Sequence, residues 1–135
     1  MKNYSAAKDD SNCSRTCDSV ADGGKATQTL HEVELTMFNR SMCNKPWWYA
    51  NLLTDRMMCA GDLAGGRGTC TGDSGGPLAC VDESLSTWTL YGLTSWAKVP
   101  CAGPDSPTVF TRISAFVQWI NSIIEKSATA DIANP

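Results

Sequence analysis

The 135-residue sequence has no run of 18 or more apolar residues, so it offers no candidate for a membrane-spanning helix. It also lacks a strong excess of either charge, because its formal net charge is -3. This balance argues against a nucleic acid or an anionic membrane as a partner. Histidine is almost absent, and His31 is therefore the only conceivable imidazole base. We expect no cofactor and no metal, since no motif for either is present.

The N-terminal residues Met1-Lys2-Asn3-Tyr4 begin no apolar segment of the kind found in a signal peptide. Seven cysteines in a chain of this length nevertheless indicate an oxidising, extracellular or secretory environment. The two observations agree if an N-terminal portion that carries the export signal is missing. Three Asn-x-Ser sequons, at Asn3, Asn12 and Asn39, fit a secreted protein, although such tripeptides are also common by chance.

Hydrophobic patterning predicts a polar arm followed by one β-rich domain. Residues 1–28 are polar and rich in turn formers, and we expect a loop or arm without a clear strand. Residues 31–38 alternate, with Val33, Leu35 and Met37 on one face, which predicts a half-buried strand. Further strands, rich in β-branched or aromatic residues, are predicted at 77–81, 86–97 and 108–113.

Short strands separated by turns favour an all-β antiparallel barrel, here over residues 29–126, and the length allows one modest core. The end of this domain is predicted to be a helix, with Ser114 as its N-cap. Residues 127–135 are small and polar and predict a disordered tail. The apolar residues at helical spacing are Ile113, Phe116, Val117, Ile120, Ile123 and Ile124.

The run Gly72-Asp73-Ser74-Gly75-Gly76-Pro77, with Cys70 before it and Cys80 after it, is typical of an activated serine. A serine hydroxyl becomes a good nucleophile when a neighbouring base takes its proton. The glycines leave room for a substrate carbonyl, and the N–H groups of Gly72 and Ser74 could converge on an oxyanion. A glycine-rich turn between strands would explain Gly-Gly alone, but six specified residues match by chance at only about 10⁻⁸ to 10⁻⁷ per position.

This run resembles the nucleophile loop of chymotrypsin-like (trypsin-fold) serine proteases, with Ser74 as the nucleophile and Gly72 and Ser74 as the oxyanion hole. The resemblance covers about residues 30–126 and corresponds to the C-terminal half of the family's domain. It implies an antiparallel Greek-key β-barrel, the second of the trypsin-like fold, with a C-terminal α-helix. The other segments in family order are Leu30–Leu35, Met42-Cys43-Asn44, Met58-Cys59-Ala60-Gly61, Thr94-Ser95-Trp96, Pro107–Arg112 and Ala115–Ile120.

No segment resembles the family's histidine turn or aspartate segment. The resemblance therefore implies a missing N-terminal barrel that carries both groups and would be this chain's partner. His31 is interpreted as a half-exposed strand residue and not as the base. In the family, the aspartate at the position of Asp73 pairs with an N-terminal ammonium from the first barrel. Asp73 would lack that partner here, and a buried unpaired carboxylate is costly.

The resemblance also implies the substrate-binding residues of a protease that takes peptide or protein substrates. Gly68 would form the base of the specificity pocket, with Ala97 and Thr108 on its walls. Such a pocket is uncharged and narrow, is similar to that of elastases, and would suit small aliphatic residues. The less favoured alternative is that these residues are drift in an unused pocket. Ser95, Trp96 and Ala97 would bind the substrate backbone by strand addition.

Family spacing implies two disulfides, Cys43–Cys59 and Cys70–Cys101. Cys80 would pair upstream, with Cys13 weakly favoured over Cys17 because its interval to Leu30 is nearer to the family's. A Cys13–Cys17 bridge with Cys80 free is the competing arrangement.

The sequence thus predicts a serine endopeptidase that uses acyl-enzyme chemistry at Ser74, present as an incomplete half-domain. Alone, the chain is expected to be inactive, because the triad histidine and aspartate are missing. Two alternatives stay open. One is a non-catalytic, protease-like binding or decoy module, and the other is a gene-model fragment that does not fold by itself.

Overall fold

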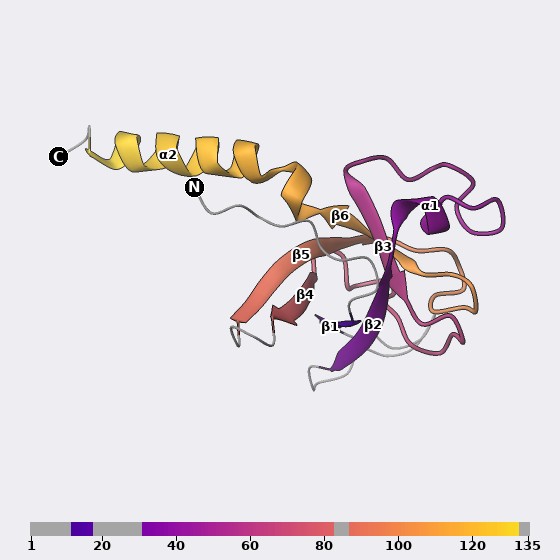
Figure 1. Cartoon of the computed structure of the whole chain (residues 1–135). Helices are drawn as coiled ribbons and strands as arrows, with labels where there is room; N and C mark the ends of the chain where they lie inside the picture. The colour runs from indigo at the N-terminus through magenta and orange to yellow at the C-terminus, as the bar shows by residue number, and fades with distance from the viewer. Residues whose placement is uncertain (1–11, 18–30, 83–86, 133–135) are drawn as a thin grey trace.

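The computed structural model describes residues 12–17, 31–82 and 87–132. In this part of the chain, antiparallel strands form one six-stranded, strongly curved sheet in the order β1-β2-β3-β6-β5-β4 (Figure 1). Three helical segments accompany it: α1 (Arg40–Cys43), the 3₁₀ turn η1 (Ile113–Ala115) and α2 (Val117–Ile132). The strands are β1 (Asn12–Cys17), β2 (Glu32–Phe38), β3 (Met57–Gly61), β4 (Pro77–Asp82), β5 (Thr87–Trp96) and β6 (Thr108–Arg112).

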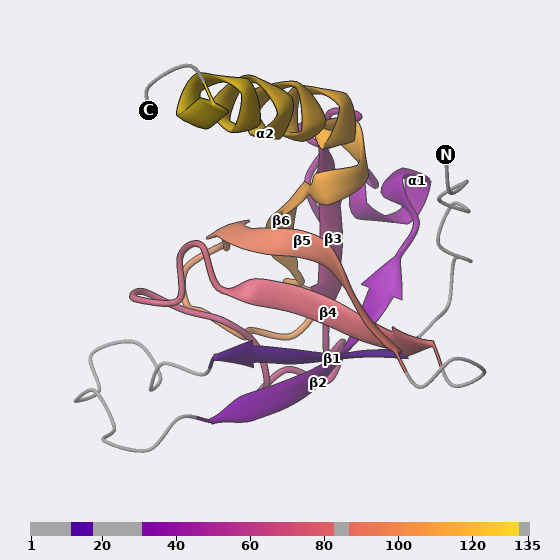
Figure 2. The same ribbon diagram turned by 90° about the vertical axis from the view of Figure 1, so that its left-hand side faces the viewer.

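The two end strands of the sheet, β1 and β4, come to lie against each other, so the sheet curls towards a barrel (Figure 2). The helix α2 leaves the sheet after β6 and projects away from it (Figure 1). The predicted all-β antiparallel barrel with a C-terminal helix is therefore confirmed.

The interior of the curled sheet is filled by the apolar face that alternation predicts for β2. Leu35 and Met37 are 1% and 4% exposed, while Glu32 and Glu34 face solvent. Burying each such side chain contributes about 1.5–3 kcal/mol relative to leaving it exposed. The other members of this core come from strands that follow in the sheet order: Met58, Ala60, Leu78, Cys80 and Phe110.

A second core lies under the loop that connects α1 to β3. The Cys43–Cys59 disulfide closes this loop, with 6.2 Å between the two Cα atoms. Asn44 holds the loop's far side, because its amide donates to the Leu53 carbonyl and accepts from the Leu53 N–H, both at 2.9 Å. Tyr49 is buried, and its hydroxyl donates to the carbonyl of Pro107. Burial raises the pKa of Tyr49, so this hydroxyl stays protonated as a donor.

The structure differs from the sequence-based expectations at three places. The polar arm contains a strand, β1, which forms because it pairs with β2 and not because of its own alternation. Ser114 does not cap a helix, because it lies within η1 and the α-helix starts at Val117. The helix continues to Ile132 through the first residues of the expected tail, where Ala128 and Ala130 favour helix. Residues 133–135 lie outside the described part.

Gly61 is a position where the packing of β3 requires glycine. A Cβ added there would lie 2.7 Å from the Cα of Pro107, which is buried backbone and cannot move aside. We expect Gly61→Ala to destabilise the oxidised protein by about 1–3 kcal/mol, as overpacking does. Gly103→Ala is the matched control, because its nearest contact would be an ordinary 3.4 Å to the Pro100 oxygen. Urea unfolding of both variants decides; equal losses would contradict the packing argument.

Candidate active site

Ser74 is exposed in a tight turn between Cys70 and the start of β4. The turn requires glycine at two positions, because Gly72 and Gly75 have positive φ angles of 104° and 81°. Two hydrogen bonds attach it to β5: the Gly75 N–H donates to the Thr94 carbonyl, and the Thr94 N–H donates to the Gly76 carbonyl, both at 2.8 Å. The serine is thus presented to solvent from a backbone that the sheet holds in place.

Asp73, next to Ser74, is buried, with 6% of its surface exposed. Its carboxylate accepts a hydrogen bond of 2.8 Å from the Cys70 N–H, and its own N–H donates to the Cys70 carbonyl at 3.1 Å. The loop therefore supplies a backbone hydrogen-bond partner to the buried Asp73 carboxylate. A carboxylate that accepts a backbone N–H forms a strong, charge-assisted bond, which fixes the turn preceding Ser74.

The end of β5 passes directly beside this turn. On one edge it pairs with β6, where Trp96 lies opposite Val109. On the other edge, β4 begins at Pro77 opposite Leu93, and the turn extends the pairing only to Thr94. From Ser95 onward, β5 has no strand on that edge within the described part of the chain. Ser95 is exposed, and Trp96 and Ala97 are half-buried.

Two of the three predicted pocket residues, Gly68 and Thr108, each lie close to one further residue. A Cβ on Gly68 would lie 3.1 Å from the Cβ of Ala102, which lies against this glycine. Thr108 is 2% exposed, and its hydroxyl oxygen is 2.9 Å from that of the buried Thr69. The structure therefore adds Thr69 and Ala102 to this region. No sequence signal marks these two residues, because neither carries a charge or belongs to a recognisable pattern.

Comparison with known proteins gives a family for this geometry. The trypsin family profile matches residues 3–120. This chain belongs to the trypsin family. It is 44% identical over 98 residues to mouse kallikrein 1-related peptidase b24, and 39% identical over 98 residues to rat submandibular glandular kallikrein-3. Human transmembrane protease serine 5 is 38% identical over 102 residues.

These matches cover most of this trypsin-family chain but a minor part of each relative. The two kallikrein matches each span 73% of the chain, but only 34% of the mouse protein and 48% of the rat protein. For the human protease the shares are 76% and 22%. The chain thus spans less than half of the length of these relatives. No helix in the described residues is long and apolar enough to cross a membrane.

Both disulfides that the trypsin-family resemblance implies are present. Cys43 is bonded to Cys59, and Cys70 to Cys101 with 5.4 Å between the Cα atoms. The second bridge ties the start of the turn that presents Ser74 to the segment that carries Ala102. Such cross-links typically contribute about 2–4 kcal/mol by restricting the unfolded chain.

Cys80 is also disulfide-bonded, so the arrangement in which it is free is wrong. The other two bridges use four of the remaining six cysteines, which leaves Cys13 or Cys17 of β1 as its partner. We expect Cys13–Cys80, and non-reducing peptide mapping of the oxidised chain checks it. A peptide that joins Cys17 to Cys80 would contradict this pairing while leaving the barrel intact.

His31 is exposed and immediately precedes β2. In the sheet order, β3 and β6 lie between β2 and the strand that holds the nucleophile turn. The structure therefore places His31 exposed and one residue before the strand, and not half-exposed on it as the sequence predicts.

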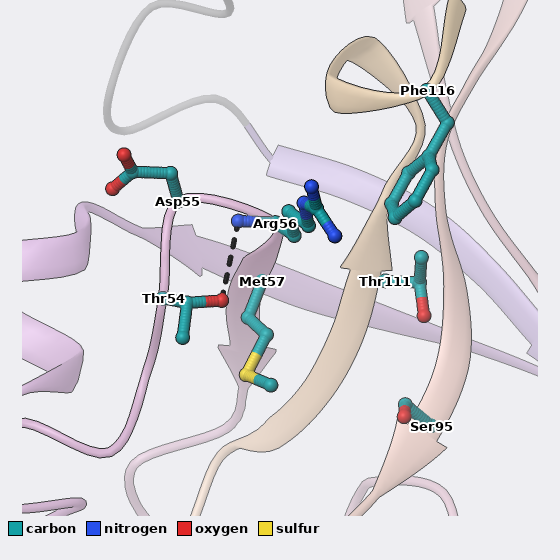
Figure 3. Close-up of a pocket in the computed structure, with 7 residues that line it drawn as sticks. All are labelled: Thr54, Asp55, Arg56, Met57, Ser95, Thr111 and Phe116. Carbon is teal, nitrogen blue, oxygen red and sulfur yellow. Dashed lines mark hydrogen bonds between the residues drawn. The ribbon is translucent and has the colours of Figure 1, made fainter. Parts of the chain in front are cut away.

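A surface pocket lies beside the free end of β5, where α2 begins (Figure 3). Ser95 and Thr111 line one side of it, and Arg56 lies on the other, with its guanidinium carbon 5.7 Å from the centre of the Phe116 ring. The Arg56 N–H also contacts the Thr54 hydroxyl at 3.4 Å. The remaining lining residues are Asp55 and Met57.

Proposed function

We propose that this chain is the second barrel of a serine endopeptidase, in which Ser74 attacks the scissile peptide carbonyl. The observation that carries the proposal is the exposed Ser74 in a turn that two hydrogen bonds attach to β5, in a chain of the trypsin family. The Ser74 oxygen forms the acyl-enzyme ester as its proton passes to a base and then to the leaving amine. Water then hydrolyses the ester by the same proton transfers in reverse.

The oxyanion of the tetrahedral intermediate would be stabilised by the N–H groups of Gly72 and Ser74. The positive φ of Gly72 and the hydrogen bond from the Cys70 N–H to Asp73 support this assignment, because both constrain the backbone around these donors. A preorganised donor of this kind is worth about 2.7–4 kcal/mol of transition-state stabilisation. Asp73 is a positioning residue in this scheme.

The substrate backbone would add as a strand to the open edge of β5, contacting Ser95, Trp96 and Ala97. The backbone of β5 is already extended here, and the turn that presents Ser74 is hydrogen-bonded to it at Thr94. The side chain before the cleaved bond would then enter the region of Gly68 and Thr108. The closeness of Ala102 to Gly68 and the hydrogen bond between Thr69 and Thr108 would favour a small aliphatic side chain there, which supports an elastase-like preference.

The base would come from a family-type first barrel that carries the catalytic histidine and aspartate. This barrel would cover the pocket beside Ser95 and the apolar side of α2. Trp119 and Ile124 are 63% and 61% exposed, and the exposed Ile123 lies one turn after Trp119 and next to Ile124. An exposed apolar stripe on a helix is typical of a protein interface. The chain's share of its relatives' length leaves room for a first barrel in those proteins.

The disulfides also support a location in the secretory pathway or outside the cell, since such bonds persist in oxidising compartments. Asn39, in its sequon, caps α1 by accepting the Met42 N–H at 2.8 Å through its side-chain oxygen. This contact leaves the amide nitrogen available for a glycan.

The test is to place the first barrel of mouse kallikrein 1-related peptidase b24 ahead of this chain and activate the product. We expect turnover of peptides with Ala or Val before the cleaved bond. Ser74→Ala should lower kcat by a factor of about a million, as loss of a nucleophile does. A soluble, correctly bridged product that binds peptides without cleaving them would favour the decoy module. An insoluble product would favour the fragment that does not fold.

A further inference from the structure

Lys98 is a cation fixed beside the proposed substrate strand. It follows Trp96 by two residues and is exposed. Its ammonium group donates to the carbonyl of Trp48 and lies 5.0 Å from the centre of the Tyr49 ring. The Tyr49 ring in turn packs edge-on against Trp96, with 5.0 Å between the ring centres. The charge is thereby held against the buried Tyr49 ring, which packs beside Trp96 at the end of β5.

The contacts of Lys98 hold its charge without neutralising it. A carbonyl oxygen and a ring face attract a cation, but neither carries a formal negative charge. Neither of the ion pairs Arg40–Asp55 and Arg67–Asp62 involves Lys98. Because two contacts already restrict this lysine, less conformational entropy is lost when an anion binds it.

The position of Lys98, two residues after β5 ends at Trp96, places this cation relative to the cleaved bond. The nucleophile turn is bonded to Thr94, so the reacting carbonyl would lie at the level of Thr94 and Ser95. The described strand pairings of this sheet are antiparallel, and an added substrate strand would continue that pattern. Moving from Ser95 to Lys98 then corresponds to moving three or four residues towards the substrate's N-terminus.

We propose that Lys98 is a specificity-determining residue that binds an acidic side chain three or four positions before the cleaved bond. This rests on the proposed function, since it requires substrate on β5. The substrate class is then a peptide with a small aliphatic residue at the cleaved bond and Glu or Asp upstream. Exposed ion pairs are modest, so we expect a two- to fivefold preference for Glu over Gln.

The experiment compares peptide pairs that differ only by Glu or Gln at the third or fourth position before the bond. Their kcat/KM ratio is measured with the joined protein, which is this chain preceded by the kallikrein first barrel. The same ratio is measured for its Lys98→Met and Lys45→Met variants. Methionine keeps the apolar packing and removes the charge. Lys45 is the matched control, because its ammonium likewise lies 5.2 Å from the centre of a ring, that of Trp47, and because it follows α1 and not β5.

Loss of the preference in Lys98→Met and its retention in Lys45→Met would support the proposal. The preference should also fall at 1 M salt, where the Debye length is about 3 Å. A ratio of one in the unmodified protein, or a ratio unchanged in Lys98→Met, would overturn it.

A second readout separates this proposal from the catalytic one. Fluorescent Glu and Gln peptides are bound to the 135-residue chain without turnover, and their anisotropy is followed for each variant. If the joined protein cleaves no peptide, the catalytic function fails, and this binding ratio still decides on Lys98. Equal anisotropy curves for the Glu and Gln peptides would then overturn the acidic subsite.

Discussion

The isolated chain should show no measurable peptide hydrolysis and no labelling of Ser74 by a fluorophosphonate probe. Ser74 is exposed and held in its turn, but a hydroxyl without a base has little nucleophilic strength at neutral pH. When triad members are missing, only the residual catalysis of the oxyanion hole and of substrate binding remains. Joining the family-type first barrel should therefore raise the labelling rate by several orders of magnitude.

His31→Ala is the matched variant for this prediction. His31 precedes β2, and β3 and β6 separate that strand from β5 in the sheet order, so removing its imidazole should leave labelling of the joined protein unchanged. Intact-mass measurement reports the labelled fraction. Stoichiometric labelling of Ser74 in the isolated chain would contradict the missing base, and loss of that labelling in His31→Ala would identify His31 as its source.

The joined and activated protein should cleave after Ala or Val in preference to Phe, Lys or Arg. In the proposed pocket, Ala102 lies against Gly68, and Thr108 is hydrogen-bonded to the buried Thr69, so a long side chain would have to displace these residues. Each methylene that an apolar pocket accepts or rejects is worth about 1–3 kcal/mol, so the preference should be graded and not absolute. A peptide library cleaved mainly after Arg or Lys would show that the pocket is misread.

A double variant, Ala97→Gly with Thr108→Gly, should move this preference towards larger apolar residues. It removes both wall side chains, and water would then hydrogen-bond to the Thr69 hydroxyl that loses its partner. Thr89→Gly on β5 is the control for the Thr108 change, because it removes the same threonine side chain at a position opposite Cys80. The measurement is the ratio of kcat/KM for Phe and Ala peptides. An unchanged ratio in the double variant would place the specificity pocket elsewhere.

Much of the barrel is predictable from sequence because its determinants are local. The alternation of Val33, Leu35 and Met37 decides the buried face of β2, since a period of two matches only a strand. Gly72 and Gly75, on either side of Ser74, likewise indicate a backbone with positive φ, which other residues rarely adopt. The Cys43–Cys59 and Cys70–Cys101 bridges follow from the family spacing that the motifs reveal.

The missed elements depend on partners that are distant in the sequence. β1 has polar residues and no alternation, and it is a strand because β2 supplies its hydrogen bonds. The α-helix begins at Val117 and not after Ser114, because η1 first turns the chain away from β6. Such boundaries are decided by the backbone path and not by helical spacing, which continues through both segments.

The residues of the chain therefore determine the family, the nucleophile motif and the core face of β2 by themselves. Only the tertiary structure brings Ala102 against Gly68, joins the hydroxyls of Thr69 and Thr108, and places Lys98 over Tyr49. The residues of each pair are between 34 and 49 positions apart, and none forms a local pattern. Their contacts arise because the disulfides and the curled sheet bring separate loops to one end of β5, which no sequence period records.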